Sequence, residues 1–292
     1  MAAGYFQVIL SAVLFGLMPL FAKNIYAMGG NSVNLCFQRF AFGIPVLYLL
    51  ARYGRKASLR VTKKQLLQMV ILSLGLGGTP LLLFSSYNYI SSGMTTTLHF
   101  VYPVLVVVCC VVFFKEKLTG EKLFCCILCV CGILCFYTPG EKGNLMGAVL
   151  ALASGVTYTF YMLFYSHSGL KELDNYVLTF YLSCCSAVML FLFSLATDKL
   201  VFYTQPMAWI LALLLSLMVA VGATILCQSG MKVIGPENAA LVSTVEPLTS
   251  VVVGCLVFAE PMSFRIVAGI GCILSSVLLL TLADRKKQNV EK

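Results

Sequence analysis

Apolar runs of about 20 residues recur along almost the whole chain, separated by short polar segments. A helix of this length crosses the ~30 Å hydrocarbon core of a bilayer, because it rises about 1.5 Å per residue. The pattern therefore predicts an all-α polytopic membrane protein with ten transmembrane helices. The expected spans are residues 5–27, 33–53, 65–90, 93–114, 121–139, 144–167, 175–197, 207–231, 237–258 and 265–283.

One stretch of the pattern occurs twice. Pro103 corresponds to Pro247 and Glu116 to Glu260, at the same offset of 144 residues. Each copy consists of small polar residues, a proline within the run, a further apolar run and the glutamate. A matched element in each half of an apolar chain is typical of carriers built from two structural repeats.

The two halves are expected to have opposite orientations in the membrane. Each half holds five spans, and because five is odd, the second half must begin on the opposite side from the first. We therefore expect two inverted five-helix repeats, residues 1–139 and 143–283, followed by a basic cytoplasmic tail, residues 284–292.

Lysine and arginine set the expected orientation. If both termini are cytoplasmic, 15 of these residues lie at the inner side and 4 at the outer side. Cytoplasmic loops carry the excess of positive charge, so this assignment is preferred. The basic loop at residues 52–64 contributes most of the difference. A specific lipid site there is a second interpretation that the sequence alone does not support.

Composition excludes several classes of protein. Hydrophobic residues make up 60% of the chain and charged residues 11%, and the mean hydropathy is +0.95. Soluble proteins carry about 25% charged residues. The net charge of +9 comes from lysines and arginines that lie mostly in the loops expected on the inner side. Their distribution is explained by membrane orientation, so no nucleic-acid partner is expected. Most of the 13 cysteines lie within apolar runs, where cysteine packs as a small apolar residue, so we expect no metal, cofactor or disulfide.

Three stretches carry a resemblance to a known family. They are FGLMPLFAK, QRFAFG, and the paired YPV…KEKLTGEKL and ENAALVSTVEPLTSVVV…AEP segments. With them, the whole chain resembles the EamA-like branch of the drug/metabolite transporter superfamily in its ten-span form. Phe15 stands where the family often has tryptophan. The resemblance implies a secondary carrier of a small metabolite, in many members an exporter, but it does not name the substrate.

Glu246 is the first candidate for the transport site. It lies about nine residues into its expected span, or about 14 Å deep, where a charge needs a compensating role. Pro247 follows it and removes a backbone donor, so a helix break is expected beside the carboxylate. The carboxylate either binds a cationic group or proton, or is held by neighbouring hydroxyls such as those of Ser243 and Thr244.

The first copy of the repeated stretch supplies His99, Tyr102 and Pro103, which share one helix face at positions i, i+3 and i+4. Imidazole titrates near physiological pH, so His99 is a candidate proton carrier; the alternative is a hydrogen-bonded packing residue. Arg39 matches a position where the family commonly has arginine, with a structural role as the favoured alternative.

Further polar candidates are Gln228 and Tyr158. Pro103, Pro247, Gly78 and the equivalent Gly222 are the expected helix-breaking positions, and for the glycines the alternative is close helix packing.

The expected function is transport by alternating access. The motifs HExxH and GxSxG and the Walker loop are absent from the sequence, so neither an enzyme nor an associated ATPase subunit is expected. We expect a secondary transporter of a small metabolite such as an amino acid, in the efflux direction and in the plasma (inner) membrane. Proton coupling and the oligomeric state stay open. The alternative is a non-carrier membrane protein such as a channel or sensor.

Overall fold

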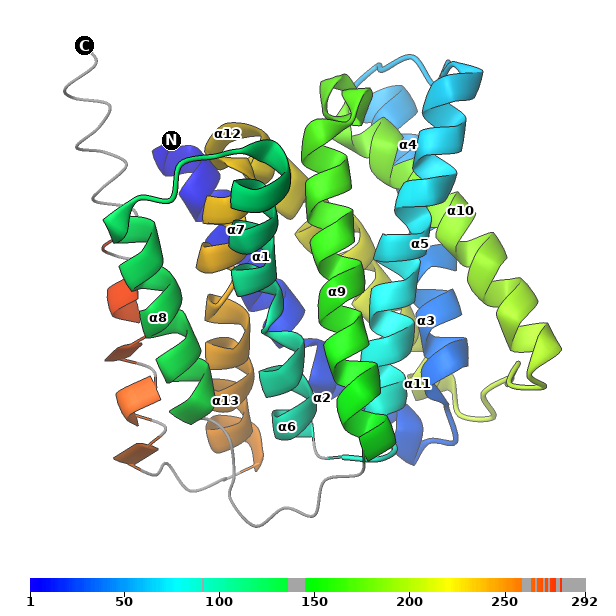
Figure 1. The fold of residues 1–292 in the computed structure, drawn as a ribbon. Helices are drawn as coiled ribbons and strands as arrows, with labels where there is room; N and C mark the ends of the chain where they lie inside the picture. Colours follow the sequence, from blue (N-terminus) through cyan, green and yellow to red (C-terminus); the bar gives the residue numbers. More distant parts are fainter. Residues whose placement is uncertain are drawn as a thin grey trace.

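The computed structural model describes residues 1–90, 92–135 and 145–258, together with 264–265, 267–269, 271–272, 274–276 and 279 (Figure 1). Every regular element in these residues is helical. Three features expected from the sequence lie outside the described residues. They are the junction between the two repeats, Glu260, and the tail at residues 284–292.

The helices follow one another with short connections. In chain order they are α1 (Ala2–Gly16), α2 (Met18–Ala27), α3 (Ser32–Ala41), α4 (Gly43–Leu49), α5 (Lys63–Ser86), α6 (Ser92–His99), α7 (Tyr102–Phe114), α8 (Gly120–Cys135), α9 (Leu145–His167), α10 (Asn175–Ala196), α11 (Pro206–Leu215), α12 (Thr224–Val242) and α13 (Val245–Phe258). π-Helical turns at Leu50–Gly54 and Ser216–Ala223 extend α4 and join α11 to α12, and a 3-10 turn at Gly169–Glu172 follows α9.

Six helical stretches in the described part of the chain are long and apolar enough to cross a membrane. They are Ala2–Ala27, Ser32–Gly54, Lys63–Ser86, Leu145–His167, Asn175–Ala196 and Pro206–Val242. The ten expected spans are not all present as separate long helices. The expected boundary between the eighth and ninth spans lies inside α12, which is kinked at Gly235. Gly235 has φ 77° and ψ 167°, a conformation that is accessible to glycine and not to residues with a side chain.

Two helices are interrupted at equivalent positions. α6 ends at His99 and α7 begins at Tyr102, while α12 ends at Val242 and α13 begins at Val245. Pro103 and Pro247 follow these turns. A proline in the first turn of a helix loses no intrahelical bond, because the first amide groups have no partner there. Each proline therefore favours a new helix start just before it.

Gly78 does not interrupt its helix, which corrects the expectation of a break there. α5 continues through Gly78 and Pro80 to Ser86. A single glycine costs only about 1 kcal/mol in a helix, and packing of α5 against α9 and α10 exceeds that cost. The neighbouring Gly75 and Gly77 face Tyr161 and Ser186 closely, so these two glycines permit close helix packing. Gly222 lies in the π-helical turn between α11 and α12, where the helix is widened and not broken.

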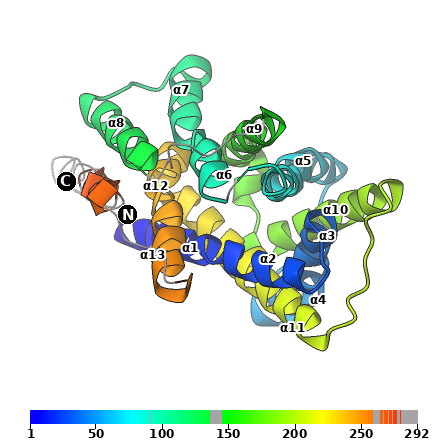
Figure 2. The same ribbon diagram turned by 90° about the horizontal axis from the view of Figure 1, so that it is seen from below.

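The helices form two rows with the core between them. Seen from below, α7, α9 and α5 follow one side of the bundle, and α13, α1, α2 and α11 follow the other (Figure 2). α5 packs along α9, and α1 packs along α12. The second contact is especially close, because Gly230 of α12 approaches Val8 and the carbonyl oxygen of Gly4 in α1.

Replacing Gly230 with alanine should destabilise the fold by about 1–3 kcal/mol, because an added methyl group there forces α1 away from α12. Gly78→Ala is the matched control, since a Cβ at Gly78 meets no atom within 4 Å. It should leave stability unchanged or raise it by up to ~1 kcal/mol. Thermal unfolding of the purified variants measures both changes. Equal melting temperatures for the two variants would contradict this account of the α1–α12 contact.

Candidate functional site

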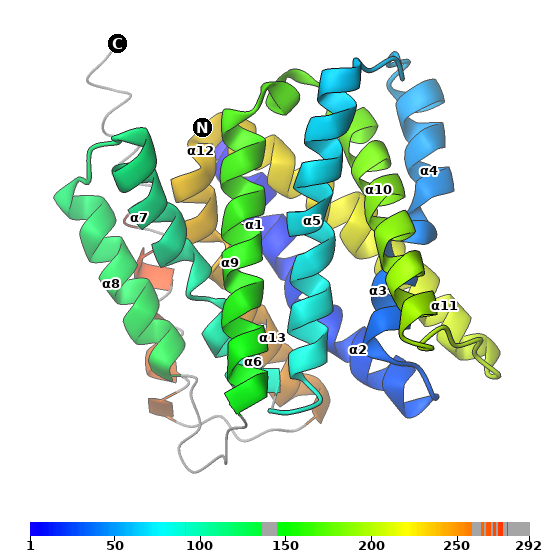
Figure 3. The ribbon, with the colours of Figure 1, turned by 45° about the vertical axis from the view of Figure 1, so that its right-hand side comes forward.

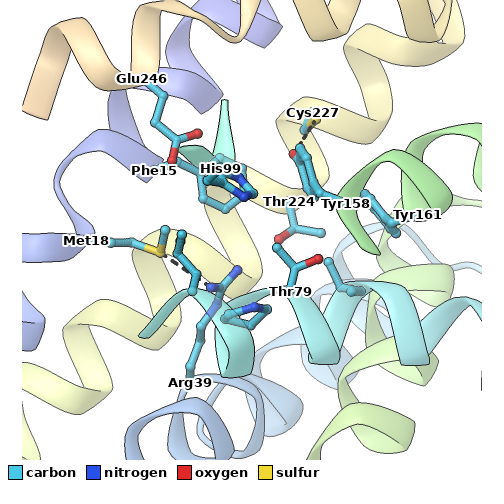
Figure 4. A pocket seen from close by; sticks show the side chains of 13 residues that line it. Phe15, Met18, Arg39, Thr79, His99, Tyr158, Tyr161, Thr224, Cys227 and Glu246 are labelled. Atoms are coloured by element: carbon cyan, nitrogen blue, oxygen red, sulfur yellow. Dashed lines mark hydrogen bonds between the residues drawn. The ribbon is translucent and has the colours of Figure 1, made fainter. Parts of the chain in front are cut away.

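A cavity lies between the two rows of helices, with about 480 Å³ of space between its atoms, including space open to the surroundings. Its walls are formed by α1, α2, α3, α5, α6, α9, α12 and α13. Most of the lining is apolar or aromatic, with a few polar side chains. Four of the predicted site residues line it: Arg39, His99, Tyr158 and Glu246 (Figure 4).

Arg39 is held in the wall by the way α3 is anchored. Asn31 caps α3 by accepting from the Asn34 amide at 2.8 Å. Side-chain amides of Asn31 and Asn34 donate to the carbonyl oxygens of Lys199 and Val201 in the loop before α11. These contacts fix the helix, and Arg39 lies in its last turn. A cation there interacts favourably with the negative end of the helix dipole.

The Arg39 guanidinium is buried but incompletely partnered. The side chain is 3% exposed and lies over the rings of Phe15 and Phe40, with Cζ 5.8 and 5.3 Å from their centroids. Nη1 donates to the Met18 thioether at 3.4 Å, and sulfur is a weak acceptor. Nε has no hydrogen-bond partner among the described residues. A buried cation with free donors can bind an anionic group that enters the cavity.

Glu246 reaches the same cavity from the helix break. It lies in the first turn of α13, and its backbone amide donates to Ser243 at 2.9 Å. The positive end of a helix dipole stabilises a carboxylate at this position. In the described residues, no ion pair within 4.0 Å joins Glu246 to Arg39. Figure 4 shows the two charged groups reaching the cavity from different helices with space between them.

His99 presents its Nδ1 nitrogen to Ser154. Its Nδ1 lies 2.8 Å from the Ser154 hydroxyl, which itself lies 2.5 Å from the Ala151 carbonyl. Because the serine proton is donated to that carbonyl, the serine oxygen accepts from His99 Nδ1–H. In the neutral ring, Nε2 is then the acceptor nitrogen.

Aromatic rings form one wall of the cavity. Tyr158 packs edge-on against Tyr102 with centroids 4.7 Å apart and stacks on Tyr161 at 5.7 Å. Tyr102 is fully buried behind Tyr158 and His99, so it supports the wall and does not line the cavity.

Gln228 lies behind the wall and not in the cavity lining. Its amide donates to the Tyr161 hydroxyl at 3.2 Å and accepts from Thr179 at 2.9 Å. It therefore positions Tyr161. The cavity is reached instead by Thr224 and Cys227 of the same helix, and by Thr79 between Gly78 and Pro80. The sequence prediction missed these three. A threonine hydroxyl within an apolar span, such as that of Thr224, was the sequence feature that could have indicated a cavity-lining residue.

A cluster of potential metal ligands lies away from the cavity. The ligand atoms of Cys110, Glu116 and Glu237 are within 4.8 Å of one another. The ammonium of Lys122 forms an ion pair with Glu237 in this cluster, so a lysine supplies the positive charge there.

Comparison with protein families matches this chain along nearly its whole length. The model of the EamA-like transporter family matches residues 2–138 and again residues 145–282.

Two curated relatives and a solved structure are similar to the chain. One protein of Archaeoglobus fulgidus, described as an uncharacterized transporter, is 25% identical over 282 residues, which is 96% of both chains. A second protein of that organism with the same description is 27% identical over 184 residues, or 62% of this chain and 63% of its own. One crystal structure superposes with a TM-score of 0.83 at 16% identity, covering 98% of this chain and 99% of the other, and it shows a shared fold.

Proposed function

Because the chain belongs to the EamA-like transporter family and is a membrane transporter of small molecules, we propose that it carries a zwitterionic metabolite of the amino-acid type. The observation that carries this proposal is the placement of Arg39 and Glu246. A guanidinium and a carboxylate face one cavity without pairing to each other. A substrate with a carboxylate and an ammonium group satisfies both, the carboxylate at Arg39 and the ammonium at Glu246.

The rest of the lining favours an apolar side chain on that substrate. The apolar side chains Phe15, Met18, Leu76 and Leu83 and the Tyr158 ring line the same cavity as the two charged groups. Ligand sites commonly combine an apolar lining with a few placed polar groups.

The mechanism we propose is alternating access between two inverted five-helix repeats in a ten-span chain. Support comes from the helix interruptions at Phe100–Val101 and Ser243–Thr244, which lie at equivalent positions of the two halves. The family model also matches each half separately. Discontinuous helices commonly form the substrate sites of such carriers.

Proton coupling in this scheme depends on Glu246. A carboxylate that binds either a proton or the substrate ammonium, but not both, exchanges one for the other across the membrane. His99, which lines the same cavity, offers a route for the proton. We propose cytoplasmic termini on the distribution of lysine and arginine. We propose the plasma membrane on the ten-span, short-loop build of the chain. Efflux is the direction that the family resemblance implies.

Thermal stabilisation of the purified protein tests the site. L-leucine should raise the melting temperature, because a ligand that binds only the folded state contributes about 2.7 kcal/mol at one hundred times its Kd. L-leucinamide lacks the carboxylate and 4-methylpentanoate lacks the ammonium group, so both should stabilise much less. Glu246→Gln should remove the leucine effect and still insert into the membrane. Equal stabilisation by all three compounds would contradict the charge pairing.

Flux through reconstituted vesicles separates the carrier from the channel alternative. We expect saturable counterflow of labelled leucine, with leucine loaded on either side of the membrane. Excess unlabelled leucine on the same side as the label should inhibit it. Ion conductance without saturation would instead support a channel.

A further inference from the structure

A second hollow, here called the lateral groove, lies on the flank of the molecule between α5, α7 and α9. Figure 3 shows these three helices side by side. The groove encloses about 990 Å³, including space open to the surroundings, and Phe113, Phe114, Val156, Phe160 and Phe164 form most of its apolar surface. None of its lining residues lines the central cavity.

The length of the groove corresponds to one leaflet of a bilayer. Val156 and His167 both line it, and the rise between them along α9 is about 16 Å. Half of the hydrocarbon core measures about 15 Å. One end of the groove is polar, with Gln68, His167 and Ser168, and there the His167 ring stacks on Phe114 with centroids 3.5 Å apart. An apolar slot with one polar end matches the division of a phospholipid into acyl chain and headgroup.

Lysines surround the polar end. Lys64 lies one helical turn before Gln68, Lys115 directly follows Phe114, and Lys171 lies in the 3-10 turn that connects α9 to α10 and contacts α5. All three side chains are exposed. We call them the basic rim.

The acidic neighbours of the basic rim do not balance its three lysines. Glu116 clusters with Cys110 and Glu237 on the α12 side of α7. Glu172 is exposed in the same 3-10 turn as Lys171 and offsets at most one of the three charges. The polar end of the groove is therefore left with an excess of positive charge.

We propose that the lateral groove binds one acyl chain of an anionic phospholipid whose headgroup lies at the basic rim. Chain contact alone gives little selectivity, because lipid tails are as apolar as the side chains that they touch. The headgroup charge decides the preference, and each lysine near an anionic headgroup contributes a factor of about five in affinity. This site is independent of the proposed substrate and of transport.

Lipid titration of the full-length chain in detergent, followed by native mass spectrometry, tests the proposal. Dioleoylphosphatidylglycerol should bind at least about tenfold more tightly than dioleoylphosphatidylcholine. The triple variant Lys64→Gln, Lys115→Gln, Lys171→Gln should reduce that preference to less than about threefold. The control triple Arg52→Gln, Lys56→Gln, Arg60→Gln removes equal charge from the turn and loop before α5 and should keep the preference.

A second pair of variants tests the chain-binding part of the groove. Val156→Trp should fill the groove and weaken binding of both lipids. Val188→Trp is the matched control, because both valines are exposed on apolar helices, at 57% and 60%, and Val188 lies on α10 away from the groove. The two tryptophan variants should differ at least about fivefold in lipid affinity.

Three results would overturn the proposal. Equal affinity for the two lipids would remove the anionic preference. An equal loss in the rim and control triples would assign the effect to general surface charge. Competition by glycerol 3-phosphate at the same concentration as the lipid would make the rim a soluble-anion site and not a lipid site.

Discussion

Arg39→Gln should reduce the transport of a zwitterionic substrate by about thirtyfold or more. Truncating one partner of a buried, hydrogen-bonded charge pair costs about 2–5 kcal/mol, and the substrate carboxylate would lose its buried cation. Glutamine removes the buried cation, and Glu246 has no ion pair with Arg39 to lose, so the ligand-free protein should fold. Initial rates of leucine counterflow in reconstituted vesicles measure the effect.

Selectivity distinguishes a binding role of Arg39 from a structural one. Wild-type protein should prefer L-leucine to L-leucinamide, and Arg39→Gln should bring the two affinities close together, because only leucine carries the carboxylate. Arg39→Lys should recover part of the preference, since it keeps the charge and loses the planar fork of donors. Arg55→Gln is the control, because Arg55 is 61% exposed and pairs with Asp174 away from the cavity. An unchanged selectivity in Arg39→Gln would assign Arg39 to folding alone.

The positions of the two charged groups follow from features that a sequence displays. Arg39 and Glu246 are ionisable residues deep in apolar runs, and such residues carry a cost that only a role can offset. The prolines at 103 and 247 mark the helix starts, because proline lacks a backbone N–H and fits a helix best in its first turn. Membership of the EamA-like transporter family also follows from motifs in the chain, and the family model confirms it.

The sequence does not predict which side of each helix faces the cavity. Thr224, Cys227 and Gln228 stand at i, i+3 and i+4 on one face of α12. The pattern therefore does not separate Thr224 and Cys227, which line the cavity, from Gln228, which lies behind it. The helix break expected at Gly78 is wrong, because the stability of a helix at a glycine depends on packing partners that are distant in sequence. The pairing of Lys122 with Glu237 joins residues 115 positions apart and has no local signal.

Breaking that ion pair should cost more stability than breaking the other ion pair in the described part of the chain, Arg55–Asp174. Lys122 is 18% exposed and Glu237 5%, and they join α8 to α12 just beyond the kink at Gly235. Lys122→Met should lower the free energy of unfolding by about 3–5 kcal/mol, because Glu237 is left buried without its cation and close to Glu116. Glu237→Gln should cost less, since Lys122 retains Glu116 as a neighbour. Unfolding of the detergent-solubilised variants measures these changes.

A double-mutant cycle identifies the cause of that loss. Lys122→Met combined with Glu237→Gln removes both charges, and it should be more stable than Lys122→Met alone by at least about 2 kcal/mol. The exposed pair of Arg55 and Asp174, with 3.6 Å between nitrogen and oxygen, is the control, and its loss should cost about 0–1 kcal/mol. If the double variant is as unstable as the sum of the single variants, the two side chains do not stabilise each other. In that case the contact between α8 and α12 depends on apolar packing around Lys122 and Glu237 and not on their charges.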